Sequence, residues 1–195
     1  MLTSAISASN APATRERALT AEDLIRMGED ATVGMELVDG KLVGKNMPAG
    51  YRHGSIEAII VALLMAYMRT AKLGRILSGE VGIFIRRNPD AIRAVDAAFI
   101  SDARYARMRS DTYLDVAPEL VIEVMSPTDT WSEVKQKLRD YFYAGVLLAW
   151  IIDPGSETIT TYDAEGGVRE FATGGTLVAE SLLHGFAARV AEVFE

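Results

Sequence analysis

The sequence predicts an α/β or α+β fold with a mixed central β-sheet flanked by helices. Three observations support this prediction. Apolar residues recur at helical spacing between His53 and Lys72. Short apolar segments of strand type follow this stretch, and turn signals such as Asp39-Gly40 separate them. We expect residues 1–18 to be a disordered tail and residues 19–195 to form a single domain, because only the first segment lacks apolar periodicity.

Composition limits the class of protein. The chain has 195 residues, of which 49% are hydrophobic and 24% charged, which suits a soluble protein with one well-filled core. It contains no run of 18 or more apolar residues, and its N-terminus lacks the charged start and apolar centre of a signal peptide. We therefore expect a cytoplasmic protein without membrane contact.

The N-terminal part predicts a short helix, a hairpin and a long helix. Thr20 followed by Asp23, with Gly28 at the end, is typical of a short capped helix. In "MELVDGKLV" the central pair Asp39-Gly40 predicts an N-terminal hairpin, because both residues can adopt positive φ. The long helix is predicted by the apolar positions Ile56, Ile59, Ile60, Leu63, Leu64, Tyr67 and Met68.

The remaining chain predicts the sheet and one further helix. The expected strands lie in "GRILSGEVGIFIRR", "AVDAAFIS", "APELVIEV" and "LLAWIIDP". Thr130 and Glu133 form a capping-box pattern for a helix that ends at Gly145. "TITTYDAEGGVREF" predicts a C-terminal hairpin that turns near Gly166 and offers an edge strand to another subunit. The large apolar side chains expected in the core include Leu147, Leu148, Trp150 and Ile151.

Two of these apolar strands each contain a carboxylate. Asp96 lies between Val95 and Ala97, and Glu123 lies between Ile122 and Val124. Removing an isolated ionised carboxylate from water costs several kcal/mol, so such a group is usually paired, hydrogen-bonded, protonated or bound to a cation. If the two strands are neighbours, both acids can converge on one Mg²⁺ or Mn²⁺. The alternative is that each acid lies at a strand end in solvent.

A lysine near such a site would help to stabilise charge on a phosphate. In "SEVKQKLRDYFYAGV" the apolar face of the helix is formed by Val134, Leu138, Tyr141 and Phe142. Lys137 borders that face, whereas Lys135 points about 200° away from it. A lysine in this position can reach the strand ends, or it can be an ordinary solvated flank of the helix.

Other metal sites and partners are restricted by the residue counts. The chain has no cysteine, and its two histidines, His53 and His184, are too far apart in sequence to suggest a histidine-based zinc site. Any metal must therefore be held mainly by oxygen. The net charge of −7 argues against a general nucleic-acid binder, which usually carries a basic face.

The order of these segments resembles that of the bacterial Uma-type family of predicted restriction endonucleases. This family was formerly described as a domain of unknown function. The matching pieces cover about residues 20–165 and are "MELVDGKLV", "HGSIEAIIVALL", "GRILSGEVGIFI", "VDAAFIS", "APELVIEVMSP", "KLRDYFYAGV" and "AWIIDP". The family belongs to the PD-(D/E)xK restriction-endonuclease-like superfamily. Its members cut DNA with a metal held by acidic residues on a sheet flanked by helices.

The resemblance implies roles for particular residues. Asp96 and Glu123 are the two acids of the signature, and they hold Mg²⁺ or Mn²⁺. Lys137 replaces the usual strand lysine, since Met125 stands two residues after Glu123. Glu80, in "SGEVGIF", matches a further family acid that adds a ligand to the metal. Glu36 and His53 also match family positions, although a hairpin surface acid and a helix-start polar residue explain them equally well. Val95 stands where the family has proline.

The implied activity is a Mg²⁺- or Mn²⁺-dependent endodeoxyribonuclease that acts on DNA as a homodimer. The segment from Arg86 to Arg109 is rich in arginine and is expected either to grip a phosphate backbone or to form a solvated loop with salt bridges. A non-catalytic binding module on the same fold is the alternative function, and the acidic net charge favours it. The two acids within apolar strands favour catalysis.

Overall fold

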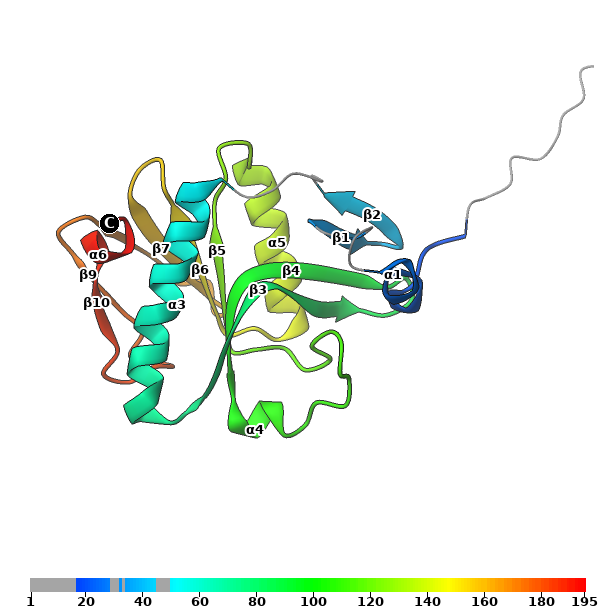
Figure 1. Cartoon of the computed structure of the whole chain (residues 1–195), viewed down its shortest axis with the longest axis horizontal. Helices are drawn as coiled ribbons and strands as arrows, with labels where there is room; N and C mark the ends of the chain where they lie inside the picture. Colours follow the sequence, from blue (N-terminus) through cyan, green and yellow to red (C-terminus); the bar gives the residue numbers. More distant parts are fainter. Residues whose placement is uncertain (1–16, 29–31, 33, 45–49) are drawn as a thin grey trace, which may run out of the picture.

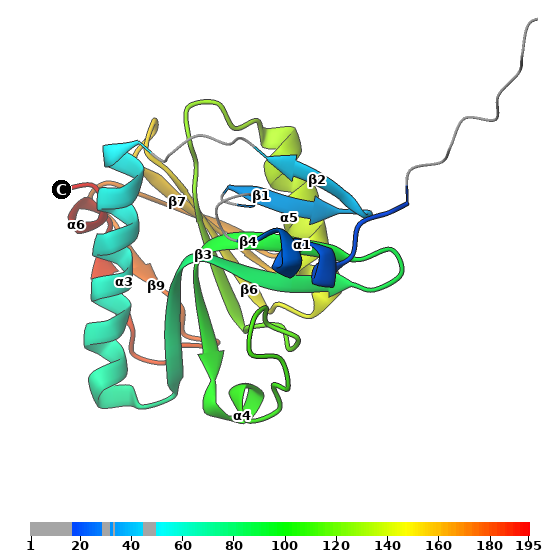
Figure 2. The same ribbon diagram turned by 45° about the vertical axis from the view of Figure 1, so that its right-hand side comes forward.

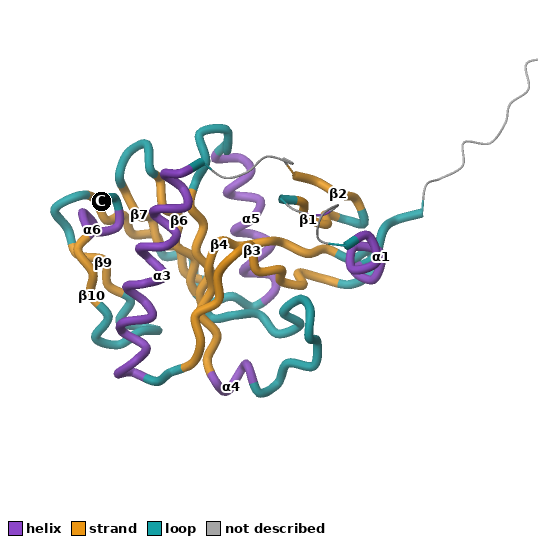
Figure 3. The backbone as a smooth tube through the Cα atoms, in the orientation of Figure 1, coloured by secondary structure: helices purple, strands orange, loops and turns teal. Residues whose placement is uncertain are grey.

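A central sheet between helices forms the body of the molecule (Figure 1). The computed structural model describes residues 17–28, 32, 34–44 and 50–195. The long helix α3 covers one face of the sheet and α5 covers the other, as the turned view in Figure 2 shows. In Figure 3 the central strands lie between α3 and α5, whereas β9 and β10 lie at the outer side of α3. The predicted mixed sheet flanked by helices is confirmed.

Apart from the short helix α4, the elements follow one another as the sequence predicts up to the second hairpin. The helices are α1 (Ala21–Met27), α3 (Tyr51–Ala71), α4 (Asp102–Tyr105), α5 (Trp131–Ala144) and α6 (Val190–Val193). The strands are β1 (Met35–Val38), β2 (Lys41–Gly44), β3 (Gly74–Arg86), β4 (Ala91–Ser101), β5 (Leu120–Val124), β6 (Leu148–Asp153), β7 (Thr158–Asp163), β8 (Val168–Ala172), β9 (Thr176–Val178) and β10 (Ala187–Arg189).

Strand β4 organises the sheet. The strand order is β2-β1-β4-β5-β6-β7-β8, and β3 pairs with β4 outside this path. Only the β5–β6 pair is parallel among the described strand pairs, so the sheet is mixed and mostly antiparallel. Because β3 runs along the whole of β4 on one edge, β1 and β5 must share the opposite edge. The two strands use different halves of that edge.

Two apolar clusters fill the space between the sheet and the helices. On the α3 side, alternate residues of β5 and β6 pack against Ile56, Ile60 and Leu64, together with side chains from the C-terminal segment. On the α5 side, the other residues of the same strands pack against Val134 and Leu138. The helical spacing of these residues is therefore explained by burial of one helix face on each side.

Local signals in the sequence determine several element ends. Thr20 caps α1 and Thr130 caps α5, and each threonine N–H in turn donates to the carboxylate of the acid three residues later. Asp39 and Gly40 turn the first hairpin with φ of 51° and 72°, which is the conformation that the Asp-Gly pair predicts. Gly145 ends α5 in the left-handed conformation with φ of 102°.

Other expectations need correction. Leu147 was expected in the core but is 44% exposed, because it precedes β6 and lies outside the sheet. Leu148, Trp150 and Ile151 are buried as expected. The hairpin of β7 and β8 is followed by the small sheet of β9 and β10 and by α6, whose apolar residues complete the cluster against α3.

The predicted tail falls mostly on residues 1–16, which lie outside the described residues. Arg17, within the predicted tail, forms an ion pair with Asp23 of α1 at 2.8 Å. Helix α3 is long and apolar enough by composition to cross a membrane, and it is the one helix of that kind in the described part of the chain. Its buried side chains, Ile56, Ile60, Leu64 and Met68, belong to the apolar cluster between this helix and the sheet.

Candidate active site

The candidate site lies at a break in the pairing of β4. Strand β1 pairs with β4 through Leu37 and Ile92, and β5 pairs with it through Ala97, Ala98 and Phe99. Between them, no described strand pairs with this edge over residues 93–96. Glu36 precedes Leu37 on β1 and Glu123 follows the last paired residue of β5, so the two acids flank the gap from opposite sides.

Side chains of the site satisfy the backbone groups that the missing strand would have satisfied. The N–H of Ala94 donates to Glu36 Oε1 at 3.1 Å, and the carbonyl of Ala94 accepts from Tyr141 at 3.3 Å. The N–H of Val124 donates to Asp96 Oδ2 at 2.6 Å. Buried backbone groups need such partners. The polar residues at the gap are therefore part of the sheet's own hydrogen bonding.

Asp96 lies where the side-chain alternation of β4 is broken. Residues two apart in a regular strand face the same side of the sheet. Val95 packs in the cluster on the α5 side, whereas Ala97 packs in the cluster on the α3 side. The two neighbours of Asp96 therefore face opposite sides of the sheet, although in a regular strand they would face the same side. Opposite Asp96, β3 carries a bulge between Ser78 and Val81. Such bulges re-aim side chains, and the carboxylate of Asp96 consequently reaches both β5 and α3.

On the α5 side, Glu123 is surrounded by two donors from one helix face. Lys137 Nζ donates to both carboxylate oxygens of Glu123, at 2.9 Å and 3.1 Å. The hydroxyl of Tyr141, one helical turn further along, donates to Glu123 Oε1. The side chains of Glu123 and Lys137 are only 14% and 27% exposed. The acid inside the apolar strand is thus a hydrogen-bonded partner of a buried lysine.

A second ion-pair group supports this lysine. Glu36 lies 3.4 Å from Lys137 Nζ and accepts a hydrogen bond of 2.7 Å from Arg93. Arg93 is buried and also donates twice to Asp140 Oδ2, at 2.6 Å and 2.8 Å. These ion pairs therefore form a series of charges that alternate in sign. The series runs from Asp140 on α5 through Arg93 and Glu36 on the sheet to Lys137 on α5 and Glu123 on β5. Removing one member would leave a buried charge without its partner.

On the α3 side, a different group surrounds Asp96. His53 Nε2 lies 3.3 Å from Asp96 Oδ1, and Glu57 lies one helical turn after His53. One ligand atom from each of His53, Glu57 and Asp96 lies within 4.8 Å of the others. The N–H of Gly79, in the bulge of β3, donates to Glu57 at 3.3 Å. Helix α3 and helix α5 thus each contribute a pair of side chains, four residues apart, to opposite sides of the gap.

The electrostatic environment changes the pKa of several groups. Burial raises the pKa of Glu123 to about 7, and the negative charge of Asp96 adds to this effect, while Lys137 opposes it. Burial disfavours the charged form of Lys137, but the attraction of Glu123 and Glu36 outweighs it and raises the pKa of the lysine. Burial also raises the pKa of Tyr141 far above its ordinary value.

The groups on the α3 side are shifted as well. The hydrogen bond to Asp96 raises the pKa of His53. The pKa of Glu57 is raised by burial first and then by the charge of Asp96. Asp96 contributes to both shifts, as the main cause for the pKa of His53 and as the second cause, after burial, for the pKa of Glu57.

The structure brings together most of the site residues that were predicted from the sequence. Asp96, Glu123, Lys137, Glu36 and His53 all contact at least one other member of the set. Glu80 lies in the bulge of β3 with φ of 56°, is exposed, and accepts a bond from the N–H of Gly34 at 3.3 Å. Its charge raises the pKa of Glu57, so it lies at the margin of the α3 side.

Four residues around the site were not predicted as site residues from the sequence, and they are Glu57, Tyr141, Arg93 and Asp140. Glu57 follows His53 by four residues, and Tyr141 follows Lys137 by four residues. This spacing places each pair on one helix face and was the available signal. Tyr141 was assigned only to the apolar face of its helix, although its hydroxyl reaches Glu123. Arg93 and Asp140 were not selected because a buried ion pair between distant elements has no local sequence pattern.

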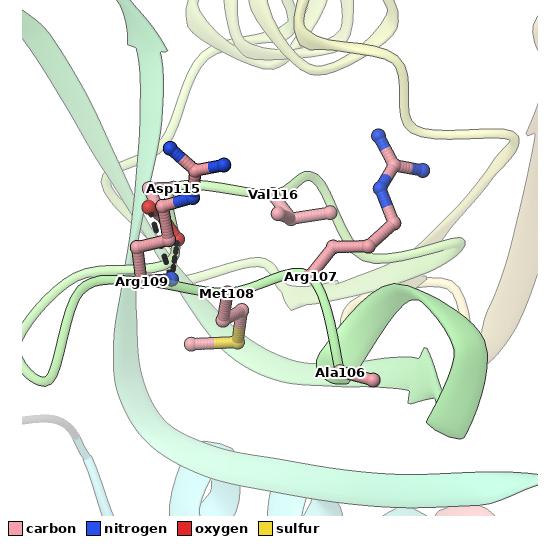
Figure 4. A pocket seen from close by; sticks show the side chains of 6 residues that line it. All are labelled: Ala106, Arg107, Met108, Arg109, Asp115 and Val116. Atoms are coloured by element: carbon pink, nitrogen blue, oxygen red, sulfur yellow. Dashed lines mark hydrogen bonds between the residues drawn. The ribbon is translucent and has the colours of Figure 1, made fainter.

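The arginine-rich segment separates into different environments. Arg93 belongs to the buried charge group, and Arg104 donates to the carbonyls of Ala117, Pro118 and Gly145. Arg107 and Arg109 are exposed beside a hollow of about 450 Å³ that no residue of the acid site lines. Their guanidinium groups extend to the same side of the loop (Figure 4). The segment is therefore divided between a buried ion pair at Arg93 and an exposed loop at Arg107 and Arg109.

Comparisons with known proteins identify a similar fold and the family of the chain. A crystal structure of a "putative nuclease belonging to DUF820" from Anabaena variabilis ATCC 29413 superposes with a TM-score of 0.73 at 19% sequence identity. The match covers 90% of this chain and 97% of that chain. Curated proteins give no match. Residues 21–191 match the family Uma2, described as "Putative restriction endonuclease". The chain therefore belongs to the Uma2 restriction endonuclease family.

Proposed function

We propose that the protein is a divalent-metal-dependent endodeoxyribonuclease whose active site is the gap in β4. Asp96 and Glu123 are the metal ligands and Lys137 stabilises charge. The observation that supports this most directly is the contact of Lys137 Nζ with both carboxylate oxygens of Glu123, beside the charge of Asp96. An acid pair with a lysine suits metal-assisted phosphodiester hydrolysis, in which the acids hold the cation and the lysine stabilises negative charge.

The donor set suits a hard divalent cation. Carboxylate oxygens from two adjacent strands face a partly buried gap. Near Asp96, the negative charges of the acids are only partly neutralised by cationic side chains. Mg²⁺ and Mn²⁺ bind through such oxygens and keep positions for water and phosphate. A cation bound there would neutralise part of the phosphate charge and would lower the pKa of a bound water molecule.

The protein's own groups position and stabilise the reacting phosphate. Lys137 is kept charged by Glu123 and Glu36 and is held by Ala94 O, so its ammonium is fixed before substrate arrives. A preorganised cation stabilises negative charge that develops in the transition state without reorganising. Tyr141 fixes one oxygen of Glu123, which orients the carboxylate.

Membership in the family supports DNA as the substrate. Arg107 and Arg109, exposed on the loop after α4, provide positive charge for phosphate contacts outside the acid site. The net charge of −7 means that such contacts must be local. The same feature favours the alternative, a non-catalytic binding module, which would use the fold without hydrolysis.

Plasmid cleavage separates the two functions. Purified protein should convert supercoiled plasmid to open-circular and linear forms with Mg²⁺ or Mn²⁺ and should stop when EDTA is added. Asp96→Asn should lose cleavage while retaining its circular-dichroism spectrum. Absence of cleavage by wild-type protein on plasmid and on a range of linear duplexes with either cation would contradict the nuclease assignment and favour the binding module.

A further inference from the structure

The charges on the two sides of the gap are balanced differently. On the α5 side, the acids Glu36, Glu123 and Asp140 are paired with the permanent cations Lys137 and Arg93. On the α3 side, the carboxylates of Asp96 and Glu57 converge, and the charge of Glu80 adds to theirs. The only basic group in contact with Asp96 there, among the described residues, is His53. Among the described residues, the acids on the α3 side therefore have less neutralising positive charge than those on the α5 side.

His53 has an unfilled hydrogen-bonding capacity at this place. Its Nε2 faces Asp96, whereas its Nδ1 is buried and has no partner among the described residues. Buried side-chain nitrogens are normally satisfied. The first turn of α3 fixes the ring, and Glu57 on the next turn projects from the same helix face. The three side chains come from two rigid elements, a 21-residue helix and a long strand, which suits a preformed site.

We propose that His53, Glu57 and Asp96 form a cation site with one nitrogen and two carboxylate ligands, and that this site selects Mn²⁺ over Mg²⁺. The proposal rests on the proposed function only in taking Asp96 as a metal ligand. Mg²⁺ binds through oxygen and loses its water reluctantly. An imidazole ligand instead favours first-row transition metals, so the nitrogen shifts the preference toward Mn²⁺. Asp96 is the ligand that this site shares with the proposed pair of Asp96 and Glu123, and Lys137 approaches that pair from the α5 side through its two bonds to Glu123.

Metal binding without DNA tests the proposal. Isothermal titration of the full chain with MnCl₂ and with MgCl₂ should give Mn²⁺ affinity at least about tenfold higher. Pulsed electron paramagnetic resonance of the Mn²⁺-loaded protein should show coupling to a ¹⁴N nucleus. In protein labelled with ¹⁵N-histidine the coupling should change to that of ¹⁵N, which identifies the ligand as histidine without any substitution.

Variants assign the nitrogen and its neighbours. His53→Gln should remove the nitrogen coupling and weaken Mn²⁺ binding on the order of tenfold or more, with a smaller effect on Mg²⁺. His184→Gln is the matched control, because His184 is the only other histidine and its side chain is 93% exposed. It should leave both measurements unchanged. Glu57→Gln should weaken Mn²⁺ binding while the nitrogen coupling persists in the fraction that binds.

The outcomes separate this proposal from the nuclease assignment. Mn²⁺ binding without nitrogen coupling, equal affinity for the two cations, or no binding of Mn²⁺ would each overturn the mixed-ligand site. Histidine coupling in a protein that cleaves no DNA would support the site and contradict the nuclease function. Cleavage by a protein without histidine coupling would do the reverse.

Discussion

At the scale of single residues, charged side chains occur within an apolar sheet because they replace missing strand hydrogen bonds and neutralise one another. Glu36 accepts from the backbone of Ala94 and from Arg93, and Asp96 accepts from the backbone of Val124. Each carboxylate therefore has both a polar partner and a position in the backbone pairing. A hydrophobic substitution at these positions would leave backbone groups buried without partners.

The raised pKa of Glu123 predicts a pH-dependent stability. A carboxyl whose pKa rises on folding binds its proton more tightly in the native state, so its contribution is present below the unfolded pKa of 4.5 and is lost as pH rises through about 7. The loss is on the order of 3 kcal/mol. Lys137 adds no slope in this window, because its pKa is raised from 10.5.

Glu123→Gln removes this titration. We expect the variant to gain stability relative to wild-type protein as pH rises from 5 to 8, measured by denaturant unfolding at several pH values without added metal. Other titrating groups, including His53, are common to both proteins and largely cancel in the difference. A stability difference that stays constant across this pH range would show that Glu123 does not titrate there.

Tyr141→Phe tests the hydroxyl that the sequence did not reveal. The change removes a buried donor to Glu123 and to the carbonyl of Ala94 while keeping the ring in the core. Loss of a hydrogen bond to a charged group costs about 1.5–3 kcal/mol. Because this bond favours the ionised form of Glu123, the pKa of Glu123 should rise further in the variant. Unfolding at pH 8 measures the cost, and the exposed Tyr143→Phe provides a control that should be neutral.

Sequence reasoning found some residues of the site and not others for a physical reason. Asp96 and Glu123 could be predicted because each is an acid inside an apolar strand, and this pattern can be recognised from the neighbouring residues alone. Lys137 is visible because it borders an apolar helix face. Arg93 and Asp140 are 47 residues apart and meet only after the sheet and α5 have packed, so no local pattern could join them.

At the scale of elements, the hairpins, helix caps and helix faces could be predicted because turn and capping residues act within a few positions. The length of β4 and the break in its pairing could not be predicted. They depend on β1 and β5, which approach the same edge from distant parts of the chain. The small sheet of β9 and β10 gave no sequence signal because each strand has only three residues.

Helix α3 offers a direct test of its contribution to stability. Gly54 lies inside this helix, is exposed, and leaves open space where a Cβ atom would be. Gly54→Ala should stabilise the protein by about 0.5–1 kcal/mol, because glycine loses more conformational freedom in a helix than alanine does. Thermal and denaturant unfolding measure the change.

A second glycine provides the opposite expectation. At Gly74, a Cβ atom would lie 2.2 Å from the carbonyl oxygen of Ile100 on the paired strand, so Gly74→Ala should destabilise the protein. If both variants changed stability in the same direction, the packing of α3 and of β3 against β4 would be wrongly described.

At the scale of the whole molecule, β2, β3 and β8 each pair with a single strand among the described strands and so are edge strands of the main sheet. An edge strand can pair with a second subunit. We expect a homodimer that uses β8, where Val168 is 63% exposed. Val168→Lys should then shift the protein toward monomer in light scattering at high concentration. Val43→Lys on β2 is the matched control and should leave the dimer intact. A monomeric wild-type protein, or an effect of Val43→Lys alone, would contradict dimerisation through β8.

The central claim is that the gap in β4 is a nuclease site with Lys137 as its charged group. The most direct measurement compares cleavage of supercoiled plasmid by Lys137→Ala and Lys135→Ala with Mn²⁺. Lys137→Ala should lower the cleavage rate on the order of 10²-fold or more while Mn²⁺ binding by titration persists, because Lys137 stabilises charge in the proposed site but is not a metal ligand. Lys135 is exposed on the same helix, and its variant should cleave like wild-type protein. Equal, small effects of the two substitutions would contradict the assignment of Lys137.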